Sequence, residues 1–162
     1  MPLNRNNFTA VVKDIRQQSE MKHQEIKTKP DTVVRSLLEG LRQRFRDLLA
    51  IYAFGSRVSG NAGPESDLDL AILVEGKADS VALWHLAGEL GDLTGCPVDL
   101  LDLRAASTVM QHRIITTGER LWARDHQADL YESFILSEKT ALDEARAPLM
   151  AIIQREGTIH GR

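Results

Sequence analysis

Two aspartates separated by one residue, Asp67 and Asp69, are the side chains in this sequence best suited to metal chemistry. They open the apolar segment DLDLAILV at positions 67–74. Because side chains alternate between the two faces of a strand, both carboxylates should lie on one face and the leucines beside them on the other. Neighbouring carboxylates repel each other, and Mg²⁺ relieves that repulsion because it prefers hard oxygen ligands. The pair therefore predicts a magnesium site.

A third carboxylate from an adjoining strand would complete such a site. The segment CPVDLLDL at positions 96–103 offers two, Asp99 and Asp102. They are three positions apart, so in a strand they point to opposite faces, and at most one of them should line the pocket of the paired aspartates. We favour Asp99 as the third metal ligand.

A loop rich in glycine and serine precedes the paired aspartates. Gly55 has no side chain and lets a phosphate approach the backbone closely. Ser56 offers a hydroxyl and a backbone N–H, and Arg57 adds a charged fork for phosphate oxygens. We expect Gly55, Ser56 and Arg57 to hold a triphosphate that bridges this loop and the metal. Two metal ions in such a site can activate an attacking hydroxyl and stabilise a leaving pyrophosphate.

The elements that must position these residues follow from the apolar periodicity. Short apolar segments predict strands at 48–54, 67–74 and 96–103, and RLWA predicts a small strand or turn. Helical spacing predicts a helix after Pro30, a second one closed by Gly95, and a short one before Gly118. This order predicts an α/β or α+β fold with a small mixed sheet covered by helices.

The C-terminal part of the chain, from about Asp125 onward, has a helical pattern. We expect Leu130, Phe134 and Ile135 to pack inward along this segment. Pro148 should break or kink the helix, because proline lacks the backbone N–H that continues the hydrogen-bond ladder.

Length and composition narrow the class of protein. The 162 residues suit one domain, in which we distinguish a polar, partly helical N-terminal extension at 1–30, a core at 31–124 and a helical segment at 125–162. The formal net charge of -3 argues against a protein that coats duplex nucleic acid. One cysteine suits a reducing compartment, and no apolar run approaches the ~20 residues of a membrane span. The N-terminus lacks the apolar run of a secretory signal, so we expect a cytoplasmic protein.

The combination of these motifs resembles a known family. Gly55-Ser56, ten residues, and then Asp67-Leu68-Asp69 are similar to the signature of the DNA polymerase β-type nucleotidyltransferase superfamily, and the chain most resembles its minimal nucleotidyltransferase branch. The likeness extends over roughly 37–122 and includes VDLLDL and IITTGERLWARD. It implies Mg²⁺ and ATP as cofactors and transfer of a nucleoside monophosphate. It also implies that Asp99 is the third metal ligand and a base toward the acceptor.

The resemblance further implies a partner. Members of this branch are commonly antitoxins paired with a HEPN ribonuclease toxin, and some silence the toxin by adenylylating its tyrosine. We therefore expect this chain to transfer AMP to a hydroxyl of a cognate HEPN-type toxin. Two alternatives stay open: an antitoxin that acts by contact alone, and a nucleotidyltransferase that modifies an antibiotic hydroxyl. The second is less favoured because only about 40 residues follow Trp122 to build a pocket for a small acceptor.

Overall fold

The computed structural model describes residues 30–63 and 65–156. The expectation of a partly helical extension at 1–30 concerns residues that lie outside these ranges, apart from Pro30. Among the described residues, no helix combines the length and the apolar character needed to cross a membrane.

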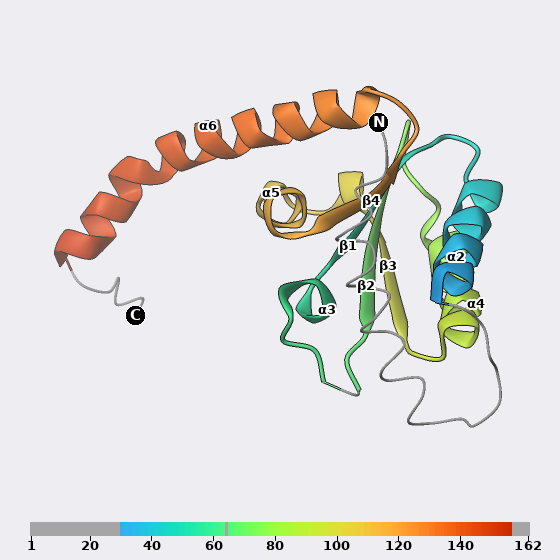
Figure 1. Ribbon diagram of the computed structural model, residues 1–162. Helices are drawn as coiled ribbons and strands as arrows, with labels where there is room; N and C mark the ends of the chain where they lie inside the picture. The colour runs from blue at the N-terminus through green and yellow to red at the C-terminus, as the bar shows by residue number, and fades with distance from the viewer. Residues whose placement is uncertain (1–29, 64, 157–162) are drawn as a thin grey trace.

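A four-stranded mixed sheet forms the centre of the fold (Figure 1). Its strands stand in the order β3-β2-β1-β4. β1 pairs antiparallel with β2 and β4, whereas β2 and β3 run parallel. The strands are β1 (Leu48–Phe54), β2 (Leu68–Val74), β3 (Val98–Asp102) and β4 (Glu119–Ala123). The three strands predicted from apolar segments are therefore confirmed, and RLWA belongs to a fourth.

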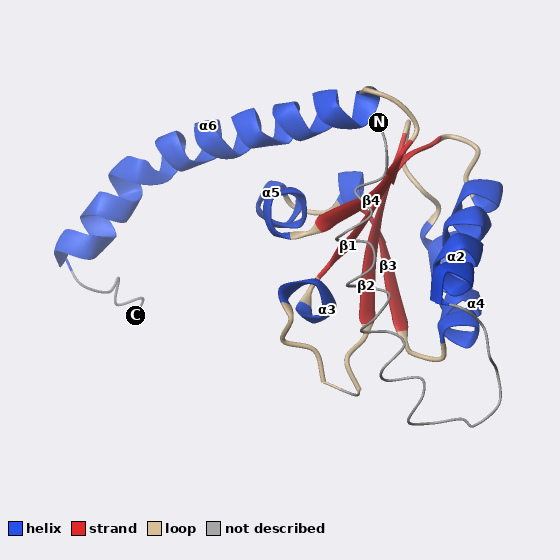
Figure 2. Cartoon of the chain, viewed as in Figure 1, coloured by secondary structure: helices blue, strands red, loops and turns tan. Residues whose placement is uncertain are grey.

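Helices cover both faces of this sheet (Figure 2). One face carries α2 and α4, and the other carries the single-turn helix α3 together with α5 (Figure 1). The helices are α2 (Pro30–Arg44), α3 (Ser56–Ser59), α4 (Ser80–Thr94), the 3₁₀ turn η1 (Leu103–Ala105), α5 (Thr108–Thr117) and α6 (Gln127–Glu156). The predicted α/β fold with a small mixed sheet is confirmed.

Local chemistry explains where α4 begins and ends. The Asp79 side chain accepts a hydrogen bond from the backbone N–H of Ala82 at 2.7 Å and so satisfies one donor of the first turn. Gly95 follows the last turn in a left-handed conformation, with φ of 71°, that favours glycine. The helix therefore returns the chain to the sheet next to β2, where β3 begins.

Two apolar layers hold the sheet between its helices. Leu68, Leu70 and Ile72 of β2 belong to the layer shared with α2 and α4. Ala71 and Leu73, the residues that alternate with them, belong to the opposite layer with Ile114 of α5 and Ala128 of α6. This alternation fixes which face of β2 carries Asp69, because a slip of one residue would exchange the two layers.

The structure corrects two expectations about α6. Leu130 and Phe134 are 63% and 55% exposed, whereas Ile135 is buried as expected. The two exposed residues lie on the far side of the helix from Ala128 and Ile135, which contact the body of the protein. The helix also continues as one element through Pro148 and curves along its length instead of breaking (Figure 1). The described residues from 143 to 152 are exposed, so the helix can bend at the missing N–H of Pro148 without disturbing the packing of the core.

Candidate functional site

The sheet register brings two of the predicted acidic residues side by side. Asp69 of β2 is the direct partner of Asp99 in the parallel pair of β2 and β3. Asp67 immediately precedes β2 and is exposed, as is Asp99, while Asp69 is half-buried. The three carboxylates therefore gather at one end of the sheet, as the sequence predicts.

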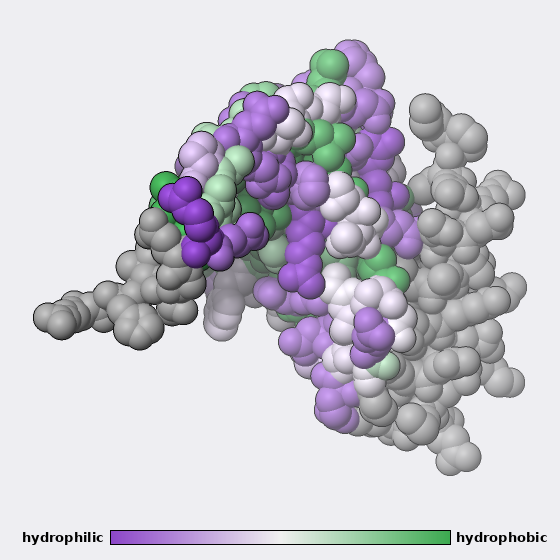
Figure 3. All heavy atoms as spheres, turned by 90° about the vertical axis from the view of Figure 1, so that its left-hand side faces the viewer, coloured by the Kyte–Doolittle hydropathy of each residue, from purple (hydrophilic) through white to green (hydrophobic). Residues whose placement is uncertain are grey.

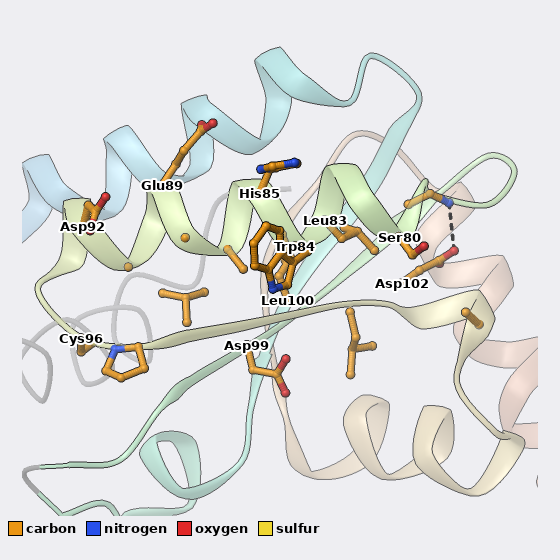
Figure 4. Close-up of a pocket in the computed structure, with 18 of the residues that line it drawn as sticks. Ser80, Leu83, Trp84, His85, Glu89, Asp92, Cys96, Asp99, Leu100 and Asp102 are labelled. Atoms are coloured by element: carbon orange, nitrogen blue, oxygen red, sulfur yellow. Dashed lines mark hydrogen bonds between the residues drawn. The ribbon is translucent and has the colours of Figure 1, made fainter.

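Asp102 has a different environment from Asp99, and the two side chains lie on opposite sides of β3 (Figure 4). The Asp102 carboxylate is buried and accepts hydrogen bonds from the backbone N–H groups of Ala78, at 3.0 Å, and Arg104, at 2.9 Å. These bonds tie the loop before α4 to the end of β3. Asp102 is thus a structural residue, in agreement with the preference for Asp99.

Electrostatic repulsion is concentrated on Asp69. Burial raises the pKa of the Asp69 carboxyl above its ordinary value, and the neighbouring carboxylates of Asp99 and Asp67 raise the pKa further. The Arg57 guanidinium opposes this shift only in part. A bound divalent cation would remove the repulsion, and carboxylate oxygens are the kind of ligand that a hard cation such as Mg²⁺ prefers.

The carboxylates do not by themselves form a complete metal cage. The described residues include no group of three or more histidine, cysteine, aspartate or glutamate side chains arranged to hold a metal ion. Mg²⁺ commonly takes one or two carboxylates from the protein and completes its shell with water and phosphate oxygens. A metal at this position would therefore draw ligands from a bound nucleotide as well as from the protein.

Gly55 packs directly against the Asp69 carboxylate. Its backbone has φ of 78° and ψ of -157°, a combination found essentially only in glycine. A Cβ at this position would stand 2.0 Å from Asp69 Oδ2. Contact with Asp69 therefore requires glycine at position 55. This reason is separate from the close approach of a phosphate that the sequence predicts.

Ser56 is the first residue of α3 and follows Gly55 at the start of the loop. Its carbonyl accepts the backbone N–H of Asn61 at 3.0 Å, and the N–H of Ser59 donates to the Gly55 carbonyl at 3.1 Å, which closes a tight turn. A helix of one turn has a small dipole, so its attraction for a phosphate would come from the Ser56 hydroxyl and backbone N–H. The role of Gly55 and Ser56 in holding phosphate stays a prediction.

Arg57 makes contacts that the sequence did not reveal. Its side chain is buried, and Nε donates to the carbonyl oxygens of Ser66 and Asp67, each at 3.1 Å. A second nitrogen of the guanidinium also donates to the Ser66 carbonyl. Arg57 therefore fastens the end of the loop, next to Asp67, to its beginning. Its expected contact with phosphate stays a prediction.

Comparisons with known proteins agree with this fold. The chain belongs to the family described as "Polymerase beta, Nucleotidyltransferase", which matches residues 37–127. The resemblance found in the sequence is thereby confirmed, and the chain contains a nucleotidyltransferase domain.

Particular relatives make the family likeness more specific. The chain is 37% identical over 95 residues to the protein adenylyltransferase MntA of Shewanella oneidensis, an alignment that covers 59% of this chain and 68% of MntA. It is similar to a chain in a crystal structure of a toxin-antitoxin with AMP-PNP, at 32% identity and a TM-score of 0.67, over 74% of this chain and 97% of that one. A structure of tri-AMPylated Shewanella oneidensis HEPN toxin in complex with MNT antitoxin contains a chain 29% identical, with a TM-score of 0.64, over 76% of this chain and 98% of that one.

Proposed function

We propose that this protein transfers AMP from ATP, with Mg²⁺, to a hydroxyl of a HEPN-type toxin and thereby neutralises it in the cytoplasm. The observation that carries the proposal is the pairing of Asp69 with Asp99, beside the Gly55 turn that only glycine can make. The protein adenylyltransferase MntA and the AMP-PNP-bound toxin-antitoxin structure support the choice of AMP and of a protein acceptor.

The roles of the residues follow from their positions. Asp67, Asp69 and Asp99 would hold Mg²⁺, which supplies positive charge to the triphosphate and the leaving pyrophosphate. Gly55 and Ser56 would hold the phosphates, and Arg57 keeps the loop in place through the carbonyls of Ser66 and Asp67.

Asp99 is suited to act as the base because it is exposed on the outermost strand next to Asp69. It would accept the proton of the attacking hydroxyl as the oxygen bonds to the α-phosphorus of ATP. The bond from that phosphorus to the bridging oxygen breaks at the same time, and pyrophosphate leaves. The products are a phosphodiester between AMP and the acceptor, pyrophosphate, and a proton on Asp99.

Transfer of radiolabelled AMP to a cognate HEPN-type ribonuclease tests the proposal. We expect the double change Asp67→Asn and Asp69→Asn to abolish labelling, with an unchanged circular dichroism spectrum. Asp47→Asn is the matched control, because Asp47 is an exposed carboxylate in the turn before β1. Labelling by the double variant at the parent's rate would overturn the proposal. A double variant that fails to label but still neutralises the toxin at equal stoichiometry would assign neutralisation to contact alone.

A further inference from the structure

The sheet has an open edge next to the candidate base. β3 is the outermost strand in the order β3-β2-β1-β4, so within the described part of the chain no strand pairs with its outer side. An exposed edge presents backbone N–H and C=O groups that a second extended chain can bond. Asp99 is the second residue of this strand.

A cavity of about 1310 Å³ follows this edge between β3 and α4. Its walls come from 80–92 of α4 and from 95–102, which includes β3. In Figure 4, Trp84 extends from α4 toward β3, whereas Asp99 points away on the other side of the strand. We call this feature the edge groove. A chain laid along the outer side of β3 would reach both the Trp84 ring and the Asp99 carboxylate.

Trp84 is a large apolar side chain that is exposed to solvent. It is 73% exposed and contacts, within its own helix, the ring of His85 edge-on with centroids 5.0 Å apart. The buried residues of α4, Leu83 and Leu86 among them, face the sheet and hold the helix in place, so the tryptophan stands on a rigid support. Exposed tryptophans beside a groove are typical anchors for protein partners, because their large apolar surface is buried on binding.

The charges along the edge groove indicate the charge that a bound partner would carry. Glu89 and Asp92 of α4 are exposed along its wall, and Asp99 lies at the strand. The described residues that line the groove include no lysine or arginine. The carboxylates of Glu89 and Asp92 would attract a basic peptide to this wall of the groove.

We propose that the edge groove receives an extended, basic segment of the acceptor protein, which lies alongside β3 and packs an apolar side chain on Trp84. This placement brings the acceptor hydroxyl to Asp99, so the groove determines which hydroxyl is modified. The inference rests on the proposed AMP transfer and adds to it the surface that recognises the acceptor.

Steady-state labelling of the cognate HEPN-type acceptor protein tests this recognition. We expect Trp84→Ala to raise the KM for the acceptor by about tenfold or more, the effect of losing an aromatic anchor, while kcat at saturating acceptor and the affinity for ATP stay unchanged. Glu89→Lys combined with Asp92→Lys should raise the same KM and make it less sensitive to salt. Val81→Ala is the matched control, since Val81 is 60% exposed on the same helix but does not line the groove.

Hydrogen exchange gives a second readout that does not depend on catalysis. A synthetic peptide centred on the modified residue should slow exchange of the backbone amides at 98–102 in the full-length protein. An unchanged KM in Trp84→Ala, or unchanged exchange at 98–102, would overturn the inference while the parent still transfers AMP. A parent that transfers no AMP would instead overturn the proposed function, and the inference with it.

Discussion

At the scale of single residues, the contact between Gly55 and Asp69 links the glycine- and serine-rich loop to the acidic residues. A Cβ added to Gly55 would lie 2.0 Å from Asp69 Oδ2, far closer than van der Waals contact allows. Any side chain at position 55 must therefore displace either the loop or the carboxylate.

We predict that Gly55→Ala lowers the free energy of unfolding by about 1–3 kcal/mol, because alanine disfavours this backbone conformation. It should also weaken binding of Mg²⁺ and ATP, because Asp69 must move. Chemical denaturation and calorimetry measure the two effects. Gly63→Ala is the control from the same loop, since a Cβ there meets nothing within 4 Å. Equal behaviour of the two variants would contradict this account of Gly55.

Arg57 of the loop and Asp69 of β2 differ in how far the sequence could predict their positions and contacts. The position of Asp69 followed from strand alternation, because a strand buried on its other face permits only one register. The contacts of Arg57 did not follow from local sequence, because its partners are carbonyl groups of Ser66 and Asp67. Every residue carries a carbonyl group, so only the folded path of the loop shows which ones an arginine meets.

At the scale of elements, a polar cluster fastens α6 to the sheet. The hydroxyl of the buried Tyr52 on β1 donates to Glu132 of α6 at 2.8 Å. Arg120 of β4 forms ion pairs with Asp129 at 2.6 Å and with Glu132 at 3.1 Å. Tyr131 adds a hydrogen bond to Gln111 of α5 at 2.5 Å. These contacts hold the first turns of α6 over the same face that carries α5.

We predict that Tyr52→Phe lowers the free energy of unfolding at neutral pH by about 1–2 kcal/mol, the cost of a lost hydrogen bond to a carboxylate. Burial, and then the Glu132 carboxylate, raise the pKa of Tyr52 well above its usual range. Unfolded tyrosine titrates near pH ~10, so the unfolded state loses this proton first and stability falls as the pH rises above that value.

The variant lacks this titration, so its stability should fall less than the parent's between neutral pH and strongly alkaline pH. Urea unfolding at several pH values measures the difference. Parallel decreases in parent and variant above pH ~10 would show that Tyr52 is not the titrating group.

Helices and strands could be predicted from the sequence where a local pattern of apolar residues also showed which side of the element is buried. The strands at 48–54 and 68–74 are continuous apolar runs, and Gly95 ends α4 where the periodicity ends. The prediction that Leu130 and Phe134 pack inward was wrong. Helical spacing shows which residues share a face of the helix but does not show whether another element covers that face. The sequence predicted either a strand or a turn at β4, because its pairing with β1 joins segments that are distant in the sequence.

At the scale of the whole molecule, α6 reaches well beyond the sheet (Figure 1). Its C-terminal half exposes Leu149, Met150 and Ile152. On the face seen in Figure 3, hydrophobic residues are interspersed with hydrophilic ones and do not form one continuous apolar area. The end of the sheet at the start of β2, in contrast, combines three acidic residues with a glycine turn.

The partner was the feature least accessible from the residues alone. Residue types and spacing predicted a metal at Asp67 and Asp69 and a triphosphate at Ser56, whereas the role of Asp99 as a base toward the acceptor came from the family resemblance. No residue pattern within this chain specifies a toxin. That expectation came from the family resemblance, and the edge groove beside β3 supplies a physical surface on which to test it.

The central claim is that Asp67, Asp69 and Asp99 hold Mg²⁺ against a triphosphate bound at Gly55 and Ser56. Isothermal titration calorimetry of the full-length protein with AMP-PNP, with and without Mg²⁺, tests it most directly. We predict Mg²⁺-dependent binding by the parent and by the Asp47→Asn control, and an affinity at least about tenfold weaker for Asp69→Asn. Binding of equal strength by the parent and Asp69→Asn, or no Mg²⁺ dependence in the parent, would contradict the claim.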